Sequence, residues 1–347
     1  MLLPLGRSDD GGRYHSVGSL QLFCNLLALL EASVIISDEH SRALPEVVTT
    51  RGRSDAVTVD NETYAAMNRC DGVVVKGDTG SCVCSELLKE IRCRHLDAVP
   101  EFRRQSDQYS VVYLDKQQIS SVPAAAFRHL RPSRIVLNFN PISAGLSEDA
   151  LRGLETSVRE LELGACQLTE LPETFLNGMT KLRRLHLWAN RIRHIPGGFF
   201  GGADELRELL LWGNELDELD ALSLGGLWNL RRLDLDRCRL TAVSKDAFRH
   251  LLELTSLRLN DNRVEALYAE TFGYMESLKS LSLDRNRISY VHERAFAGLS
   301  TLISLSLSWN RISYLPNELF APLVNLIILR LDSNRIQYVW PRTFVGL

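Results

Sequence analysis

The chain has 347 residues, of which 45% are apolar and 24% charged, and its formal net charge is −3. This composition is ordinary for a globular protein and allows one large or two modest domains. The near-neutral balance argues against nucleic acid as the main partner, because surfaces that bind it are usually basic. No uninterrupted apolar run reaches the roughly 18 residues of a membrane helix, so membrane attachment is expected only through sequence beyond this chain.

Residues 1–36 predict a signal peptide or leader. The stretch LQLFCNLLALLEASVII, which begins at Leu20, contains an apolar run as long as that of a secretory signal. A long preceding segment with offset charges leaves a buried helix or an unrelated leader as the alternative. Residues 37–69 are polar and aperiodic, and we interpret them as a poorly ordered linker. Asn61 begins the tripeptide NET, a glycosylation acceptor if the chain is secreted.

Residues 70–108 contain four closely spaced cysteines: Cys70, Cys82, Cys84 and Cys93. Two disulfides would require an oxidising compartment, and the spacing alone permits three pairings. A zinc site with four thiolates is the alternative. The single residue between Cys82 and Cys84 is tighter than usual zinc-ligand spacing, and no second C-x-x-C follows. We therefore favour disulfides and predict no metal.

Residues 109–347 consist of about ten copies of one pattern, L-x-x-L-x-L-x-x-N-x-L. Seven copies are spaced by 24 residues, and three looser copies begin at Tyr109, Pro132 and Val158. In the copy LTSLRLNDNRV, Leu257 and Leu259 alternate as in a short strand whose inward side chains fill a core. The regular copies begin at Leu182, Leu206, Leu230, Leu254, Leu278, Leu302 and Leu326.

The polar position of the pattern predicts a buried ladder. Where each strand turns away, a buried side chain must satisfy backbone groups, and asparagine offers both an acceptor and donors. Cys166 and Cys238 occupy this position in two copies, where we expect buried free thiols. Phenylalanines in the second half of most copies are expected to stack as a spine. The asparagines of the ladder are Asn190, Asn214, Asn262, Asn286, Asn310 and Asn334.

This pattern resembles the leucine-rich repeat family, in particular the 24-residue subclass of extracellular proteins such as Slit, Toll-type receptors and chaoptin-like adhesion proteins. The resemblance implies an α/β solenoid: a curved right-handed horseshoe with a parallel sheet on its concave face and an irregular or short helical convex face. It also implies a disulfide-closed N-terminal cap, with Cys70 paired to Cys84 and Cys82 to Cys93. The family shares a scaffold rather than one activity.

The C-terminal stretch WPRTFVGL lies inside a repeat. We therefore expect the chain to be a fragment without a C-terminal cap. Phe344 and Leu347 are expected to have nothing to pack against.

Function is expected at positions that point away from the core. Two tryptophans on adjacent strands, beside arginines, match the composition of binding hot spots. The alternative is that the two indoles only shelter the sheet. A second apolar patch (Ile303, Trp309, Ile327 and Ile328) has burial under a further domain as its alternative. The candidate contacts are Arg184, His186, Trp188, Arg207, Leu210, Trp212, Arg231, Asp234 and Asp236.

An arginine follows the ladder position in six repeats, interrupted by Glu215. The row could bind a polyanion such as a sulfated glycan. We favour instead ion pairing with Asp236, Asp261, Asp284 and Asp332, because exposed pairs of this kind are common. The arginines are Arg191, Arg239, Arg263, Arg287, Arg311 and Arg335.

Catalysis has little support. His186 could pair with Asp234 or Asp236, but no nucleophile aligns with them, and an open sheet does not exclude water. No catalytic residue or cofactor is predicted. We predict a secreted or cell-surface recognition module that binds a protein ligand or co-receptor on its concave face. The alternatives are a matrix protein that binds sulfated glycan and an intracellular scaffold.

Overall fold

The fold is that of a computed structural model, which describes residues 33–35, 68–70, 72–75 and 80–347. The predicted leader (1–36) and linker (37–69), together with Cys24 and Asn61, lie outside the described residues, except for Ser33–Ile35 and Asn68–Arg69.

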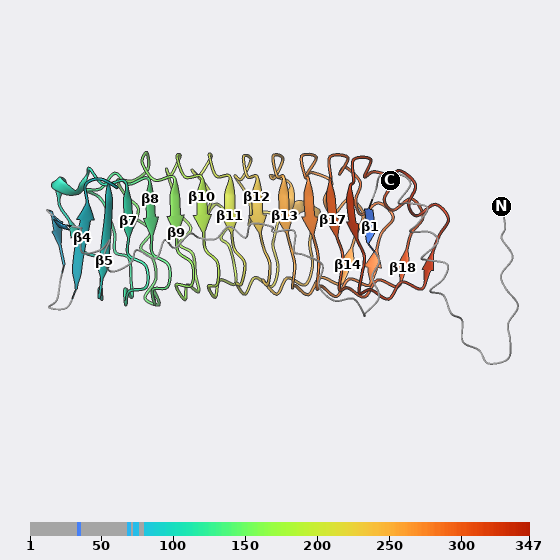
Figure 1. The fold of residues 1–347 in the computed structure, drawn as a ribbon, viewed down its shortest axis with the longest axis horizontal. Helices are drawn as coiled ribbons and strands as arrows, with labels where there is room; N and C mark the ends of the chain where they lie inside the picture. Colours follow the sequence, from blue (N-terminus) through green and yellow to red (C-terminus); the bar gives the residue numbers. More distant parts are fainter. Residues whose placement is uncertain (1–32, 36–67, 71, 76–79) are drawn as a thin grey trace, which may run out of the picture.

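Ten parallel strands, one from each repeat, form the main sheet. Figure 1 shows them side by side in sequence order, as expected when each 24-residue copy makes one turn of a solenoid. The register keeps equivalent residues opposite each other, so that Leu257 lies between Leu233 and Leu281. The strands are β7 (Val111–Tyr113), β8 (Arg134–Val136), β9 (Glu160–Glu162), β10 (Arg184–His186), β11 (Glu208–Leu210), β12 (Arg232–Asp234), β13 (Ser256–Arg258), β15 (Ser280–Ser282), β17 (Ser304–Ser306) and β19 (Ile328–Arg330).

Antiparallel strands extend the sheet at its N-terminal end. β2 (Asn68–Arg69), β4 (Ser81–Ser85) and β5 (Glu90–Arg94) pair antiparallel, and β5 joins β7 in parallel. Disulfides link Cys70 to Cys84 and Cys82 to Cys93, which is the pairing that the resemblance implies. β3 (Val73–Val74) pairs with β6 (Glu101–Phe102) beside them. These strands lie against the otherwise open edge of β7.

At the other end of the sheet, β1 (Ser33–Ile35) lies parallel to β19. Two further small parallel sheets lie in the loops of the C-terminal repeats. One joins β14 (Ala266–Leu267) to β16 (Tyr290–Val291), and the other joins β18 (Tyr314–Leu315) to β20 (Tyr338–Val339).

The core is a continuous column of leucines backed by a spine of phenylalanines. Leu257 and Leu259 are fully buried, as their alternation predicts. Phe248, Phe272, Phe296, Phe320 and Phe344 stack in sequence with centroid distances of 5.6–6.4 Å. Phe344 and Leu347 pack against the core while remaining partly exposed. The expectation that they have nothing to pack against was wrong, because the preceding repeat covers one side of each.

The predicted ladder is confirmed in its chemistry. The Asn190 amide donates to the carbonyls of Leu163 and Leu187, both at 2.8 Å. Its oxygen accepts from the backbone N–H of Cys166 at 2.9 Å. The Cys166 and Cys238 thiols are free and buried, and the Cys238 thiol donates to the carbonyl of Leu211 at 3.2 Å. Each repeat is thus bonded to the one before it, as a nearest-neighbour array requires.

The turn before the ladder position has a constant backbone shape. The residue there has a positive φ in every repeat, between 52° and 75° at Ala165, Ala189, Arg237 and Gly213. A left-handed backbone is costly for a residue with a Cβ. The hydrogen bonds of the adjacent ladder side chain hold this turn in place.

Turns make up most of the convex side. The helical content of the described residues is two short 3₁₀ segments, Arg104–Ser106 and Lys245–Phe248. Ser244 caps the second of these, because its side chain accepts from the Asp246 backbone N–H. None of the described helices is long and apolar enough to span a membrane.

Candidate functional site

Three aromatic rings form a stack at the carboxyl ends of strands β8 to β11. The indoles of Trp188 and Trp212 are parallel, with an interplanar angle of 2° and centroids 5.2 Å apart. Phe139 meets Trp188 edge-on at 5.4 Å and is 50% exposed. Both tryptophans are half-buried. We call these three residues the aromatic stack; its tryptophans are outside the core, and each keeps part of its surface free.

Gly164 makes room for the aromatic stack. It occupies the same position in its repeat as Trp188 does in the next, and a Cβ at Gly164 would overlap the indole of Trp188. The ring therefore lies against backbone that only glycine leaves open. Sequence reasoning missed both Gly164 and Phe139. Comparing equivalent positions of adjacent repeats would have revealed the glycine.

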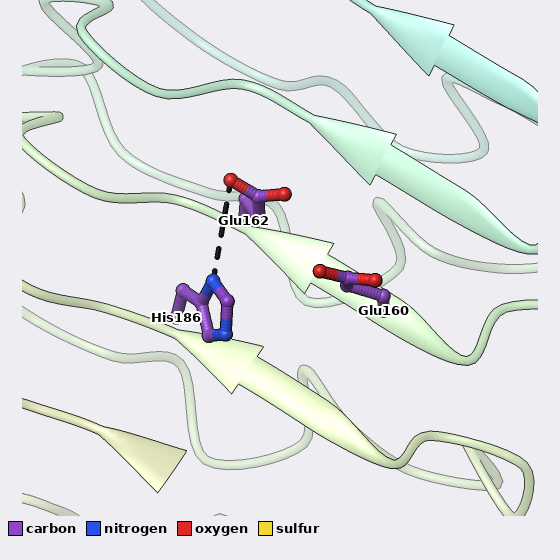
Figure 2. Close-up of side chains that lie close together, drawn as sticks. All are labelled: Glu160, Glu162 and His186. Atoms are coloured by element: carbon purple, nitrogen blue, oxygen red, sulfur yellow. Dashed lines mark ion pairs between the residues drawn. The ribbon is translucent and has the colours of Figure 1, made fainter. Parts of the chain in front are cut away.

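A network of charged side chains lies on strands β8 to β11, beside the aromatic stack. Glu162 is almost fully buried and pairs with Arg134 at 2.5 Å. Figure 2 shows that Glu160 and Glu162 project from one strand and His186 from the next. The His186 ring lies 3.3 Å from Glu208 and 4.0 Å from Glu162. We call Arg134, Glu160, Glu162, Arg184, His186 and Glu208 the charged network.

His186 differs from its prediction in its exposure. It points away from the core as expected, but it is only 9% exposed because neighbouring strands flank it. Its ion-pair neighbours are Glu162 and Glu208, whereas the hypothetical dyad would have used Asp234 or Asp236. The hydrogen bond with His186 is the main cause that lowers the pKa of Glu208 below its usual value, and the nearby Arg232 contributes to the same effect.

Glu160, Glu162 and His186 bring three potential metal-ligand atoms within 4.8 Å of one another. Cationic donors already occupy these carboxylates. Glu160 pairs with Arg184 at 2.9 Å, and Glu162 accepts from Arg134. The Asn138 amide also donates to Glu162, at 2.6 Å. A divalent cation would have to displace these donors and approach two guanidinium groups, so the cluster fits an ion-pair network better than a metal site.

Asp234 and Asp236 are also less exposed than predicted, at 6% and 9%. Both lie against the guanidinium of Arg258, with Asp234 at 3.3 Å. Burial, and then the charge of Asp236, raise the pKa of Asp234 to about 6. These two carboxylates are therefore partners of Arg258 within the sheet face, and little of their surface is left for a ligand.

From Asp236 onward, the position of the tryptophans is occupied by polar side chains that bond to the next repeat. Asp236 accepts from the backbone N–H of Asn260 at 2.7 Å, and Asn260 accepts from that of Asp284 at 2.8 Å. Asp284 in turn accepts from the Ser308 N–H at 2.8 Å. We call Asp236, Asn260, Asp284 and Ser308 the polar column; its side chains are used within the fold.

The other predicted contacts lie where their positions indicated. Arg207 and Arg231 are exposed, and neither forms an ion pair with another described residue. Arg184 is exposed but paired with Glu160, and Leu210 is half-buried. In the second apolar patch, Ile328 is half-buried, whereas the others are exposed: Ile303 at 38%, Ile327 at 55% and Trp309 at 54%.

The favoured interpretation of the arginine row was wrong. The four acids that should neutralise it have other partners: Arg258 for Asp236, Arg237 for Asp261, and serine hydroxyls for Asp284 and Asp332. In the row itself, only Arg239 forms an ion pair with another described residue, at 3.2 Å from Glu215.

The repeats match the family model described as Leucine rich repeat over residues 156–216, 204–264, 228–288 and 252–312. A search of curated proteins gave no significant match.

Solved structures with the same fold include three with 25–26% identity. The Drosophila Toll chain in complex with Spatzle is 25% identical, with a TM-score of 0.63; the match covers 69% of this chain and 33% of that one. A leucine-rich repeat protein of Leptospira interrogans is 26% identical, with a TM-score of 0.57 and coverages of 67% and 57%. A chain from an octameric complex of Latrophilin 3, Unc5D and FLRT2, the last contributing leucine-rich repeats, is 25% identical, with a TM-score of 0.56 and coverages of 73% and 83%.

This chain thus spans only about a third of the Toll chain and less than two thirds of the Leptospira one. The repeat pattern, the stacked parallel strands and these matches agree with one another. The chain carries leucine-rich repeats and has the fold of a leucine-rich repeat solenoid.

Proposed function

We propose that the chain is a non-catalytic recognition module of a secreted or cell-surface protein, and that it binds a protein ligand through the aromatic stack. One observation carries the proposal. In the repeats that carry Asp236 to Ser308, the position equivalent to Trp188 holds a polar side chain that bonds to the next repeat. In the repeats of β10 and β11 the same position holds Trp188 and Trp212, whose indoles stack on each other.

The surroundings of the aromatic stack suit a binding hot spot. Half-buried indoles are held by their neighbours and lose little conformational freedom on binding, while the ring surface that remains exposed can be covered by a partner. Arg207 and Arg231 are exposed and come directly before β11 and β12, at the other end of these strands from the tryptophans. Aromatic and arginine side chains are the types most enriched at such sites.

The size of the face is adequate for a protein ligand. Ten strands spaced by about 4.8 Å give a surface roughly 40 Å long, comparable with a standard interface. The Toll and FLRT2 structures are those of complexes with other proteins, Spatzle for Toll and Latrophilin 3 and Unc5D for FLRT2. The two disulfides support an oxidising, extracellular compartment.

The test of the binding surface is a screen of the tagged chain against a panel of purified secreted and cell-surface ectodomains. The double variant Trp188→Ala/Trp212→Ala should lose binding to a partner found with the wild type. The control Trp228→Ala/Trp340→Ala removes two exposed tryptophans outside the aromatic stack, at 49% and 38% exposure, and should bind normally. Circular dichroism checks that both variants are folded. Unchanged affinity of the folded Trp188→Ala/Trp212→Ala variant would contradict the proposal.

The compartment is tested separately by mass spectrometry of the chain under non-reducing conditions, after purification from cells with thiols blocked. Linked peptides containing Cys70 with Cys84 and Cys82 with Cys93 are expected. Four free thiols would contradict the extracellular assignment and favour an intracellular scaffold.

A further inference from the structure

Five arginines in consecutive repeats form a row on the loops that leave the main sheet: Arg239, Arg263, Arg287, Arg311 and Arg335, here called the arginine row. All five are exposed.

The backbone holds the arginine row in register. The N–H of Arg287 donates to the Val264 carbonyl at 2.9 Å, one residue after Arg263, and the N–H of Arg311 donates to Ile288 in the same way. The bonds of Arg263 and Arg335 repeat this arrangement. Successive arginines are thus fixed at the spacing of the repeats, about 4.8 Å at the strands, and form a regular line of positive charge.

The charge of this line is largely uncompensated. Glu215 pairs with Arg239 at the N-terminal end, but Arg263, Arg287, Arg311 and Arg335 have no ion pair among the described residues. In the adjacent polar column, the Asp236 carboxylate accepts from Arg258 and from the Asn260 N–H, and the Asp284 carboxylate accepts from the Ser308 N–H.

Neighbouring loop positions add little negative charge. The residues two positions beyond the row are Thr241, Glu265, Ser289, Ser313 and Gln337, of which one is acidic. Arg285, two residues before Arg287 in the chain, lies over the ring of Trp309 with its guanidinium 5.3 Å from the ring centroid, and adds a further cation. A run of like charges maintained over successive repeats with few counter-charges is suited to an external anion.

We propose that the arginine row binds a linear sulfated polysaccharide. A guanidinium group offers paired donors that match a sulfate or carboxylate, and its charge is kept at any physiological pH. A straight row of such groups suits a ligand that carries anionic groups at intervals along a chain. This surface is separate from the aromatic stack, which lies on earlier repeats, so it adds a second binding activity to the proposed function.

The choice of glycan over nucleic acid rests on two observations. The disulfides belong to an oxidising compartment, where linear polyanions are mainly sulfated glycans. The whole chain has a formal charge of −3, without the broad positive field typical of nucleic-acid binding. Binding is expected only along the row.

The experiment measures binding of the chain to immobilised heparin as a function of salt. The variant Arg263→Ser/Arg287→Ser/Arg311→Ser removes three positive charges from the row. The matched control Arg183→Ser/Arg294→Ser/Arg342→Ser removes three arginines elsewhere, one half-buried and two exposed, each already paired with a glutamate. The row variant should bind about tenfold more weakly or worse at moderate salt, with a shallower salt dependence, as the loss of ionic contacts predicts. The control should bind within about twofold of the wild type.

Three results would overturn the proposal: equal loss in both triple variants, undiminished competition by desulfated heparin, or stronger competition by single-stranded DNA than by heparin. The last would assign the row to nucleic acid, with Tyr290, Tyr314 and Tyr338 near it available for base stacking. The single variant Arg287→Ser, which changes one exposed side chain, should show part of the loss and guards against misfolding of the triple variant. Trp188→Ala/Trp212→Ala should bind heparin normally, which separates this test from that of the proposed function.

Discussion

The same position of the repeat has opposite roles in the repeats of β10 and β11 and in those of β12 to β17. In the repeats of β10 and β11 it holds Trp188 and Trp212, whose indoles stack and remain half-exposed. In the repeats of β12 to β17 it holds the polar column, in which Asp236, Asn260 and Asp284 accept from the backbone of the next repeat and the Ser308 hydroxyl donates to Asp332. The fold tolerates both, because the leucine core and the ladder are unchanged beneath them. The core beneath this position is therefore compatible with either an aromatic or a polar side chain.

The largest expected change in stability comes from Asp234, which lies with Asp236 where the tryptophans give way to the polar column. The pKa of Asp234 is raised from 3.8 to about 6 by burial and by Asp236. Between these values the folded chain binds more protons than the unfolded chain, so this group makes the free energy of unfolding fall as pH rises. Asp234→Asn removes this titration. Between about pH 4 and pH 7, the free energy of unfolding of the variant should rise relative to that of the wild type by up to about 3 kcal/mol.

Urea unfolding of wild type and Asp234→Asn across this pH range checks the prediction. The Asn side chain keeps the oxygen that accepts from the Asp236 N–H, so a general loss of structure is not expected. Parallel stability curves for the two proteins would show that Asp234 titrates normally and that its position is not a site of buried charge.

Within the polar column, Asp284→Ala should destabilise the chain by about 1–3 kcal/mol, because the buried N–H of Ser308 and the hydroxyl of Ser306 lose their acceptor. Asp284→Asn is the matched control and should be far milder: it keeps an oxygen acceptor, burial raises the pKa of the carboxyl it replaces, and Asn260 occupies the equivalent position one repeat earlier. The measurement is denaturant unfolding at neutral pH. Equal stability of the alanine variant and the wild type would mean that the polar column does not tie the repeats together.

Beside the aromatic stack, Gly164→Ala should displace the Trp188 indole. The free energy of unfolding should fall by about 0.5–1.5 kcal/mol, the range for one aromatic pair. The tryptophan signal in near-ultraviolet circular dichroism should change, while the far-ultraviolet spectrum should not. Gly225→Ala is a control in a loop outside the stack. An unchanged near-ultraviolet spectrum of Gly164→Ala would contradict the placement of the indole over this glycine.

The period of the sequence was sufficient to predict the register of the sheet. A constant 24-residue interval puts Leu233, Leu257 and Leu281 opposite each other, independently of the conformation of the loops. The ladder followed for the same reason, since Asn190 and Cys166 occupy equivalent positions and both donate to backbone carbonyls of the array.

Exposure and pairing on the sheet face could not be predicted in the same way. Asp236 pairs with Arg258, and His186 with Glu208, each 22 residues away and on the next strand. Whether an outward side chain is buried thus depends on which neighbour from the next repeat lies across it. The periodic pattern predicts which face of the sheet a side chain lies on, but it does not predict which neighbour covers that side chain. For this reason His186, Asp234 and Asp236 were expected to be exposed.

The most direct test of the central claim is amide hydrogen–deuterium exchange of the chain, alone and bound to an ectodomain identified by the panel screen. Binding should slow exchange in residues 160–166, 184–190 and 208–214, which carry and flank the aromatic stack. Exchange in the polar column, residues 256–262 and 280–286, should be slow already and change little, because its bonds are internal. Protection confined to the polar column or to the convex turns, with no change around Trp188 and Trp212, would contradict the account.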